Sequence, residues 1–548
     1  MDNKKLAELL FPHTIKTVED WESKYPKRDL PKNAKVLRFA PSPTGYYHIG
    51  GLFGTLIDYL GAKKSGGVFY LRLEDTDTKR QVENAGMIAL NVICKLGLTP
   101  NEGFGLENEG AYGPYIQSER KDIYHSFAKR FVEIGNAYPC FCEKLDDKKA
   151  IIERRKQLIE SKQGFVVKDP CRNLSFEQVV EKLKTKKDFA IRLKSQGDKN
   201  KKFEIEDIFR GKRTLRENDE DFILLKGDGL PPYAFAHMVD DYLMGTTDVI
   251  RAEEWYASTA KHIEMFKLFG LRPIKYGHTP TISINDRITG HKRKVSKRYD
   301  PEADMRFFFK SGYPNQAVID YILGLINSDF EPWRTNNPDK PIEDFPFSFA
   351  KVGSNNPYFD FTKLDNISKN IIGRMTKEEV YDNVVKWAEE FDPEFYTYLL
   401  ENKEYVIQVF GIERGNKRAR KDIAKWEDVK PNLSYLLAEP TEFEQDCLTD
   451  DNLRSKILTE YASIYDINDD NSAWFEKVKA LAIKHNFSGK ARKQDEVFEG
   501  FLGDVTDFVT IIRVAITGKK SGPNLHEIMK VLGQERVEKR LIKGAKND

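Results

Sequence analysis

The sequence predicts an α/β protein: a parallel-sheet domain interrupted by an α+β insertion and followed by an all-α half. Three observations predict this fold class. Between residues 35 and 80, two short apolar segments flank a breaker-rich loop and a helical pattern, which is the order of a parallel strand–helix–strand unit. A charge-dense stretch interrupts the pattern at about residues 116–225. Beyond about residue 380, amphipathic helical patterns repeat and strand signals are few.

The strand–helix–strand unit is the most informative stretch of the chain. Its apolar segments, Val36–Ala40 and Val68–Glu74, suit buried parallel strands. The loop Pro41–Gly45 is too rich in proline and glycine for a helix or strand interior. A helical pattern opens near His48 and ends at Gly66. Because such loops lie at the carboxyl ends of parallel strands, we expect a ligand site there.

The start of this expected helix has the features of a phosphate site. Gly45, Gly50 and Gly51 let the backbone approach a ligand closely, and the free N–H groups of a helix N-terminus favour an anion. His48 can donate a hydrogen bond to a phosphate oxygen whose charge grows during reaction. A lone histidine at a helix start is more often structural. The surrounding Pro-x-Pro-x-Gly-x-x-His-x-Gly pattern favours the functional interpretation.

Composition excludes several classes of protein. The chain has 88 Lys and Arg against 86 Asp and Glu, a net charge of +2, so nucleic-acid binding would depend on local basic patches. No apolar run reaches the roughly 18 residues of a membrane helix. The N-terminus lacks the apolar core of a signal peptide and is too acidic for a transit peptide. The five unevenly spaced cysteines favour reduced thiols or a metal site, and we expect a cytoplasmic protein.

Several segments together resemble one family. Arg38–Gly51 is similar to the first signature of class I aminoacyl-tRNA synthetases in its glutamyl form, R-F-A-P-S-P-T-G-x-x-H-x-G-G. Leu71–Asp77 resembles the R-I-E-D-T-D segment of that branch, and Gly113–Arg120 resembles its G-P-Y-x-Q-S-E-R. Leu230–Trp255 resembles P-x-Y-x-x-A-x-V-V-D-D-x-x-M-G-x-T-x-V-I-R-x-E-E-W. Lys294–Arg298 resembles the second class I signature, Lys-Met-Ser-Lys-Ser.

The second signature lies in a basic run, Gly290–Arg298, for which we expect a polar loop. Lysines there can follow the negative charge of ATP into the transition state, with Lys297 as the main contact and Lys294 as the second. An isolated basic run is more often a solvated loop or a targeting patch. The His48 segment upstream favours the nucleotide interpretation.

The resemblance implies two sets of site residues. The catalytic residues expected are His48, Lys294 and Lys297. The ATP contacts expected are Pro41, Thr44, Gly45, His48, Gly50, Gly51, Lys294, Val295, Ser296, Lys297 and Arg298. The glutamate contacts expected are Arg38, Ala40, Ser42, Glu74, Tyr233, His237 and Arg251.

The charge of glutamate explains its expected pocket. Glu74 can take the ammonium group, and Arg38 and Arg251 can each hold a carboxylate through two parallel hydrogen bonds. Which arginine meets which carboxylate stays open, and each alone would equally suit a surface ion pair. By resemblance, Arg251 meets the side-chain acid and separates the glutamyl from the glutaminyl branch. His237 stands where many members have Asn.

The expected function is ATP-dependent ligation of L-glutamate to the 3′ end of tRNA(Glu) through a glutamyl-adenylate. We expect Mg²⁺ to bridge the phosphates of ATP, and the resemblance implies a monomer. The glutaminyl branch is the nearest alternative, and Arg251, Ser42 and Gly51 argue against it. A short paralogue that modifies tRNA without reading an anticodon would stop near residue 300, so the helical C-terminal half argues against this alternative. A catalytically dead tRNA-binding scaffold is a further alternative, but such a protein would have lost His48, Lys297 or an arginine clamp. This chain keeps all of them.

A cysteine cluster is a second candidate site. Cys140, Cys142 and Cys171 have a spacing that suits zinc. Zinc takes four ligands, and some family members supply a Tyr four residues before the last Cys, where this chain has Val167. Zinc therefore lacks its expected fourth ligand, and the alternative is three buried or idle thiols.

The resemblance also implies a domain order. A short amphipathic helix with a proline-containing linker forms an extension of unassigned role, and two basic patches, Lys417–Lys421 and Lys490–Lys493, lie in the helical half. The expected domains are an N-terminal extension (1–34), a Rossmann-like first half (35–115), a connective insertion that touches the tRNA acceptor end (116–225), a second half (226–288), a stem-contact domain with the Lys-Val-Ser-Lys-Arg loop (289–380) and a helical anticodon-binding domain (381–548).

Overall fold

The computed structural model describes residues 2–43, 45–107, 109–142, 170–185, 188–286, 288–296, 299–415, 420–491 and 500–546. The chain divides into two compact units. The first holds Met1–Met305 and Ile319–Asp360, and the second holds Arg306–Val318 and Phe361–Asp548. Within the described ranges, the helices are all too short or too polar to cross a membrane.

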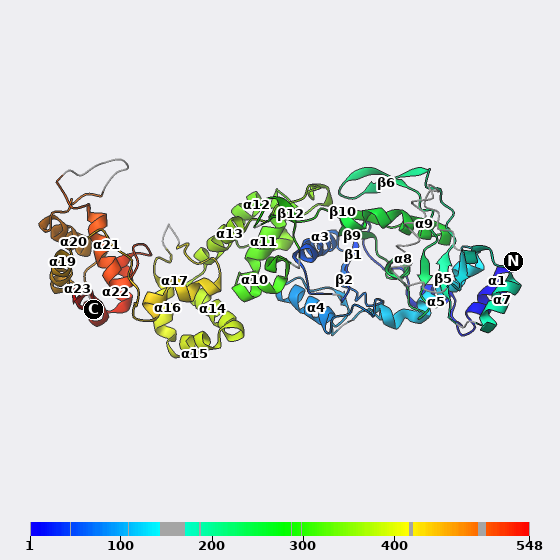
Figure 1. Cartoon of the computed structure of the whole chain (residues 1–548), viewed down its shortest axis with the longest axis horizontal. Helices are drawn as coiled ribbons and strands as arrows, with labels where there is room; N and C mark the ends of the chain where they lie inside the picture. The colour runs from blue at the N-terminus through cyan, green and yellow to red at the C-terminus, as the bar shows by residue number, and fades with distance from the viewer. Residues whose placement is uncertain are drawn as a thin grey trace. The chain divides into compact units, whose positions relative to one another are not determined.

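A parallel sheet forms the centre of the first unit (Figure 1). Its strands are β1 (Val36–Phe39), β2 (Val68–Leu71), β3 (Glu102–Gly103), β9 (Asp248–Ala252) and β10 (Lys275–Thr279). β1, β2 and β3 pair in that order, and β9 pairs with β10, all in parallel. Thr247 exchanges two 3.0 Å hydrogen bonds with Val36 across 211 residues of chain, so β9 lies beside β1. The predicted parallel-sheet fold class is confirmed.

The strand–helix–strand unit forms as the sequence predicts. Leu37 in β1 and Phe69 in β2 have no exposed surface, as expected of strands covered on both faces. Helix α3 (Ile49–Ser65) connects the two strands and has His48 as its N-cap. It ends where Gly66 adopts a left-handed conformation with φ of +65°, which a residue without a Cβ adopts at little cost.

The insertion combines strands and helices, as predicted. Its antiparallel sheet holds β4 (Ala137–Cys140), β5 (Ala190–Leu193) and β8 (Ile223–Leu225), and a separate ribbon holds β6 (Lys202–Asp207) and β7 (Gly211–Arg216). Ile208, just after β6, donates to the Tyr276 carbonyl in β10 at 2.9 Å. The ribbon therefore lies against the edge of the parallel sheet.

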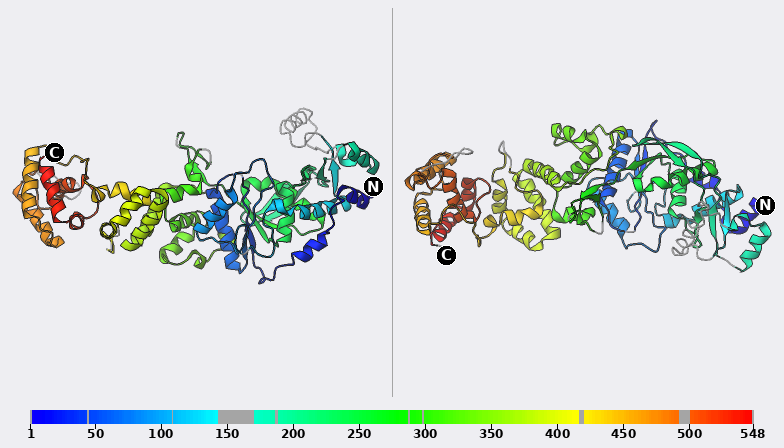
Figure 2. Two further views of the ribbon diagram at one scale, coloured as in Figure 1. Left: turned by 90° about the horizontal axis from the view of Figure 1, so that it is seen from below. Right: turned by 45° about the horizontal axis from the view of Figure 1, so that its top comes forward.

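The N-terminal extension differs from the single helix expected. It forms α1 (Asn3–Leu10) and α2 (Val18–Lys24), which pack on α5 (Lys121–Glu133) and share one hydrophobic core with it. The Trp21 indole donates to Ser126 Oγ at 2.9 Å. In Figure 2, the dark blue N-terminal helix lies beside the cyan segment. The extension thus has a structural role that its composition did not indicate.

The remaining first-unit helices are α4 (Ala85–Lys95), α7 (Phe176–Thr185), α8 (Tyr233–Leu243), α9 (Thr259–Phe269) and α12 (Phe330–Asn336), and the hairpin β11 (Ser283–Asn285) and β12 (Lys292–Lys294) follows β10. Two helices cross the boundary between the units: α10 (Met305–Ser311) and α11 (Asn315–Ile326).

Every regular element that the structure describes in the second unit is a helix (Figure 1), which confirms the all-α prediction for this half. Its longer helices carry apolar residues that meet in one core, centred on residues such as Val384, Phe410, Tyr461 and Ile512. The helices are α13 (Phe361–Arg374), α14 (Lys377–Phe391), α15 (Pro393–Glu401), α16 (Lys403–Gly411), α17 (Val429–Asn432), α18 (Ser434–Leu437), α19 (Asp451–Ile464), α20 (Asn471–Lys484), α21 (Val505–Thr517), α22 (Leu525–Leu532) and α23 (Gln534–Lys546).

The turn between α3 and β2 yields the first prediction. A Cβ at Gly67 would lie 1.9 Å from the Lys35 carbonyl oxygen, so Gly67→Ala forces backbone to move and should destabilise the protein by about 2–3 kcal/mol. Gly54, inside α3, has no atom within 4 Å of such a Cβ. Gly54→Ala should therefore stabilise by about 0.5–1 kcal/mol through helix propensity. Thermal unfolding of both variants is the measurement, and equal stabilities would contradict it.

Candidate active site

The loop after β1 lies at the carboxyl edge of the sheet, as predicted. The Glu74 N–H donates to the Pro41 carbonyl at 3.0 Å, and the Val82 N–H donates to the Pro43 carbonyl at 2.7 Å. These two bonds hold the proline-rich loop against the segment that follows β2. Thr44, expected to contact ATP, lies outside the described residues.

His48 caps α3 through its ring. The Gly50 N–H donates to His48 Nδ1 at 2.8 Å, which satisfies one N–H of the first helical turn. With Nδ1 accepting, the neutral ring carries its proton on Nε2. A Cβ at Gly51 would lie 2.8 Å from the Tyr47 ring, so the second glycine makes room for that ring. His48 therefore caps the helix and also has the tautomer that is needed to donate a hydrogen bond to a phosphate.

The chain shortly after the second signature lies beside the first signature in the first unit. The Met305 N–H donates to the Tyr47 carbonyl at 3.1 Å, and His48 forms an isolated antiparallel bridge with Asp304. The chain between β12 and this bridge contains the second signature, where Ser296 accepts from the Asp300 N–H at 2.9 Å. Lys297 and Arg298, at the end of the signature, lie outside the described residues.

The basic run is partly a strand, unlike the polar loop expected. Lys292–Lys294 forms β12, which pairs antiparallel with β11. Lys294 Nζ lies 2.6 Å from Glu254 Oε2 in an exposed ion pair, and Arg293 bonds Asp300 through both terminal nitrogens. The pairing with β11 and the two hydrogen bonds from Arg293 to Asp300 outweigh the preference of this charged sequence for a loop. Val295, the next residue after β12, is buried.

The expected glutamate contacts meet around Tyr233 at the start of α8. Burial raises the pKa of the Tyr233 phenol, the Glu74 carboxylate raises it further, and Arg251 and Arg38 oppose this shift. Three of the residues expected at the pocket, Glu74, Arg38 and Arg251, thus act on the hydroxyl of a fourth, Tyr233. The Tyr233 ring also packs on Trp255, with centroids 4.5 Å apart. The structure brings these residues together, and their contact with glutamate stays a prediction.

Arg72 organises the charges behind this group, a role that the sequence analysis missed. Its side chain is fully buried, and it donates to Asp241 Oδ1 at 2.6 Å and to Glu74 Oε1 at 2.8 Å. Arg38 Nε lies 3.4 Å from both Asp241 oxygens. Burial works to raise the pKa of Asp241, but the guanidinium groups of Arg38 and Arg72 outweigh it and hold that pKa well below its usual range.

Arg251 has a different environment from Arg38 and Arg72. Its Nε donates to His278 Nε2 at 3.1 Å, its Nη1 lies 2.9 Å from His262 Nδ1, and its Nη2 donates to Thr259 Oγ1 at 2.8 Å. The Tyr276 ring lies 4.5 Å from the guanidinium carbon. No carboxylate in the described part of the chain is within ion-pair distance of this buried cation.

His237 is buried between the two arginine environments. Its Nδ1 lies 2.5 Å from Asp241 Oδ2, its Nε2 lies 3.1 Å from the Tyr276 hydroxyl, and its ring stacks on Tyr233 at 5.5 Å. Burial lowers the pKa of His237 to about 4; Arg38 and Arg251 add to this shift, and Asp241 opposes it. The ring is neutral at pH 7.

The remaining expected contacts are either half-buried or exposed. Ala40 and Pro41 are half-buried at the end of β1, and Ser42, in the loop that follows, is exposed. Gly45 is half-buried and Gly50 is exposed beside the start of α3. Their contacts with glutamate or ATP stay predictions.

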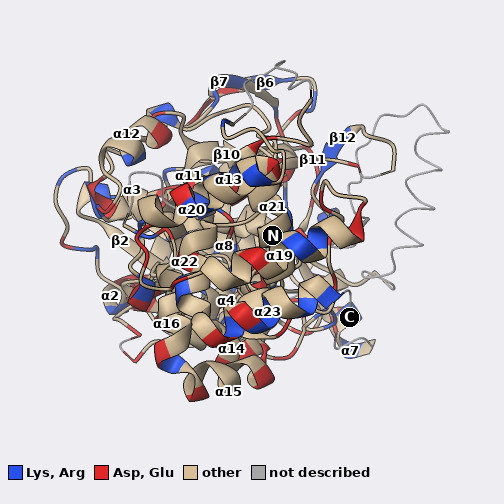
Figure 3. Cartoon of the chain, turned by 90° about the vertical axis from the view of Figure 1, so that its left-hand side faces the viewer, with Lys and Arg blue, Asp and Glu red and all other residues tan. Residues whose placement is uncertain are grey.

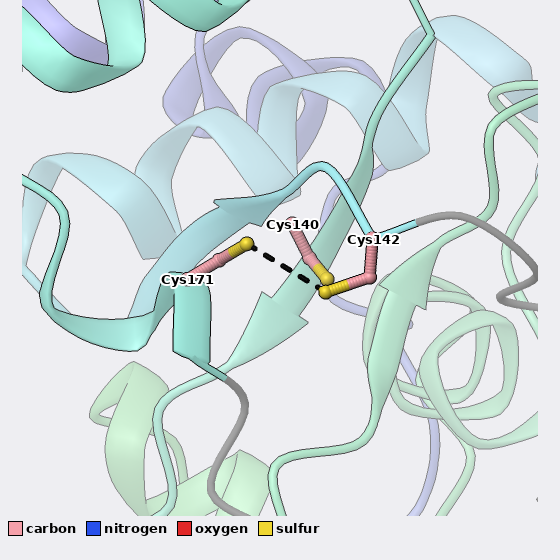
Figure 4. Close-up of side chains that lie close together, drawn as sticks. All are labelled: Cys140, Cys142 and Cys171. Carbon is pink, nitrogen blue, oxygen red and sulfur yellow. Dashed lines mark hydrogen bonds between the residues drawn. The ribbon is translucent and has the colours of Figure 1, made fainter.

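The three cysteines of the insertion come together (Figure 4). Their sulfur atoms all lie within 4.8 Å of one another, and Cys142 Sγ and Cys171 Sγ are 3.8 Å apart. Cys140 and Cys171 are buried, and the Phe141 N–H donates to Cys171 Sγ at 3.4 Å. The set offers three zinc ligands. Val167, the position considered for the fourth, lies outside the described residues.

Comparisons with known proteins agree with this geometry. Residues 35–330 match the model of tRNA synthetases class I (E and Q), catalytic domain, and residues 502–545 match that of an anticodon binding domain. The chain belongs to the class I tRNA synthetase (E and Q) family. It is 41% identical over 552 residues to a glutamate–tRNA ligase of Acetivibrio thermocellus, which covers 99% of both chains, and 39% identical over 555 residues to one of Clostridium perfringens, with 99% of each covered.

Solved structures of similar proteins share the fold. A glutamate tRNA ligase from Elizabethkingia meningosepticum, in complex with its amino acid, superposes with a TM-score of 0.74 at 25% identity, over 94% of this chain and 99% of that one. A glutamate-tRNA synthetase from Elizabethkingia anophelis gives 0.73 at 26% identity, over 94% and 100%. As a class I tRNA synthetase, this chain uses ATP.

The charged interior yields a prediction about pH. Because the pKa of His237 is about 4 in the folded protein and about 6.5 unfolded, the unfolded chain binds an extra proton between these values. Stability should therefore fall by about 3 kcal/mol from this residue as pH drops from 6.5 to 4. His237→Asn should lose less stability than the wild type over that window. Melting temperatures at pH 7.5 and 5 measure it, and equal pH dependences would contradict it.

Proposed function

We propose that this class I tRNA synthetase ligates L-glutamate to tRNA(Glu) through a glutamyl-adenylate. The observation that carries the proposal is Arg251, a buried cation whose described partners are all neutral. A guanidinium group has five N–H donors, and three of these are occupied. The other two, one on each terminal nitrogen, suit the two oxygens of a carboxylate.

The charge pattern favours an anionic side chain over a neutral one. Arg38 and Arg72 already face Asp241, so a carboxylate brought to the pocket gains most beside Arg251. Glutamine would leave Arg251 without a counter-ion in a buried place, which is costly. This supports Arg251 for the side-chain acid and Arg38 for the α-carboxylate, and it disfavours the glutaminyl alternative.

No side-chain nucleophile is required for the proposed chemistry. The α-carboxylate of glutamate attacks the α-phosphorus of ATP and pyrophosphate leaves. The terminal ribose hydroxyl of tRNA then attacks the carbonyl carbon of the mixed anhydride, and AMP leaves. His48 Nε2, Lys294 and Lys297 are proposed to stabilise charge on the phosphates. Among the described residues, the only cluster of three metal ligands consists of thiols, so Mg²⁺ would depend on phosphate and water oxygens.

The second unit is proposed to bind the tRNA anticodon. Residues 502–545 support this through their family match, and the curated relatives are named as glutamate–tRNA ligases over the full length compared. Figure 3 shows Lys and Arg interspersed with Asp and Glu along α23, so contacts would be local and not spread over one basic face. Arg420, in the expected patch Lys417–Lys421, is buried and paired with Asp422, so it is unsuited to a phosphate contact. A monomer in the cytoplasm is the proposed working form.

Exchange between pyrophosphate and ATP tests the proposal, with glutamate or glutamine and with or without tRNA(Glu). Arg251→Gln should lower kcat/KM for glutamate by at least about 100-fold, because two hydrogen bonds to a charged group are lost. Arg172→Gln is the control for amino-acid activation without tRNA, since Arg172 pairs with Asp221 in the insertion and is not among the expected glutamate or ATP contacts. The assignment would be overturned if Arg251→Gln kept the KM for glutamate of the wild-type protein. It would also be overturned if the wild-type protein used glutamine in preference to glutamate.

We also propose that Cys140, Cys142 and Cys171 bind zinc. Three sulfur atoms within 4.8 Å of one another fit three corners of a tetrahedral site, with no fourth protein ligand among the described residues. The ion would tie the end of β4 to the chain near Cys171 and would take no part in the ligation.

Elemental analysis tests this site. Protein purified without chelator should contain about one zinc per chain, and Cys171→Ser should lose it, because two thiolates bind zinc much more weakly than three. Cys94→Ser, away from the cluster, is the control. Less than about a tenth of an equivalent of zinc in the wild-type protein would contradict the proposal, and the three cysteines would then be thiols that bind no metal.

A further inference from the structure

A chain of three side chains joins the insertion to the proposed substrate clamp. Asp207 ends β6 in the ribbon, His278 lies in β10 of the parallel sheet, and Arg251 lies in β9 beside it (Figure 1). Asp207 Oδ2 lies 2.5 Å from His278 Nδ1, and Arg251 Nε donates to His278 Nε2 at 3.1 Å. All three side chains are buried.

The two neighbours of His278 determine which of its nitrogens carries the proton. The Asp207 carboxylate only accepts hydrogen bonds, and the Arg251 guanidinium only donates them. The proton of His278 therefore lies on Nδ1, and Nε2 accepts from Arg251. The carboxylate in this way orients the guanidinium through a neutral ring, without contacting it or occupying the donors that face a ligand.

Asp207 is itself held in one orientation. Its Oδ1 accepts from the backbone N–H groups of Phe209 at 3.0 Å and Arg210 at 3.1 Å, which leaves Oδ2 for His278. Such an arrangement of local backbone donors fixes the carboxylate even when the pocket is empty. The role of Asp207 and His278 is to orient a side chain and not to contact substrate.

We propose that Asp207 and His278 are positioning residues for substrate selection: they hold the Arg251 guanidinium so that its two remaining N–H groups meet the side-chain carboxylate of the amino acid. This inference rests on the proposed function of Arg251. It also gives the β6–β7 ribbon, part of the insertion, a role in amino-acid binding.

Asp207→Asn tests the proposal with little change of shape. The backbone donors at Phe209 and Arg210 keep the amide oxygen on their side, so the NH₂ group faces His278 Nδ1. The ring then carries its proton on Nε2, and an N–H group faces the Arg251 N–H. We expect the KM for glutamate to rise about 10-fold to 100-fold, while the KM for ATP and the melting temperature stay close to wild type.

Asp221→Asn is the matched control. Asp221 is a buried carboxylate in the same insertion that accepts from the Tyr138 hydroxyl at 2.9 Å and from Arg172, away from Arg251. This substitution should leave the KM for glutamate within about twofold of wild type. A folded Asp207→Asn protein with an unchanged KM for glutamate would overturn the proposal.

A double-mutant cycle separates the tautomer from general packing. His278→Gln keeps an oxygen that accepts from Arg251, and its amide has no tautomer to lose. We expect Asp207→Asn to raise the KM for glutamate in the wild-type background and to have less than a threefold effect in His278→Gln. Equal effects in both backgrounds would overturn the proposal.

Two further outcomes are decisive. If Asp207→Asn fails to fold, His278→Gln is compared with His278→Leu: the glutamine variant should have at least a tenfold lower KM for glutamate, and equal values would overturn the proposal. If the wild type does not use glutamate, the proposed function and this inference fall together. If Arg251→Gln loses glutamate use while Asp207→Asn keeps it, only the inference falls.

Discussion

The contact of Arg72 with Asp241 and Glu74 is the constraint on which the candidate site depends. It joins the end of β2 to α8, and Arg72 and Asp241 have no exposed surface there. A buried ion pair that loses one partner leaves an uncompensated charge, at about 3–5 kcal/mol. Glu74 contacts this network through Arg72, and Arg38 and His237 contact it through Asp241. The pocket residues are therefore held in position by charge balance as well as by packing.

Within this framework the two candidate clamps differ in how their charge is compensated. Arg38 lies beside a carboxylate that it shares with Arg72, whereas Arg251 is surrounded by imidazole, hydroxyl and an aromatic ring. Neutral acceptors orient a guanidinium without cancelling its charge. Burial lowers the pKa of His262 and of His278 and so keeps both rings neutral. A low-dielectric surrounding strengthens the attraction of such a cation for an incoming anion.

Much of the fold was readable from the sequence because its signals are local. The βαβ unit, the helix that begins after His48 and the all-α half follow from periodicity and breaker residues, and the structure confirms them, whereas the cap made by the His48 ring was not predicted. The role of Arg72 was hidden: it lies in a segment that resembles the family, but nothing local shows that its partner is Asp241, 169 residues away. His262 and His278 carry no motif of their own, and only the adjacent strands β9 and β10 and helix α9 bring them to Arg251. The strand at Lys292–Lys294 was missed because a partner strand overrode the polarity of its own residues.

The pairing of β1 with the segment before β9 has a consequence for synthesis of the chain. Val36 and Thr247 are separated by 211 residues, and Lys35 pairs with Asp248 across 213. At ~5–20 residues per second on the ribosome, β1 waits roughly 10–40 s for this neighbour to be made. During that time one edge of the nascent sheet has no native strand to cover it and is open to pairing with another chain.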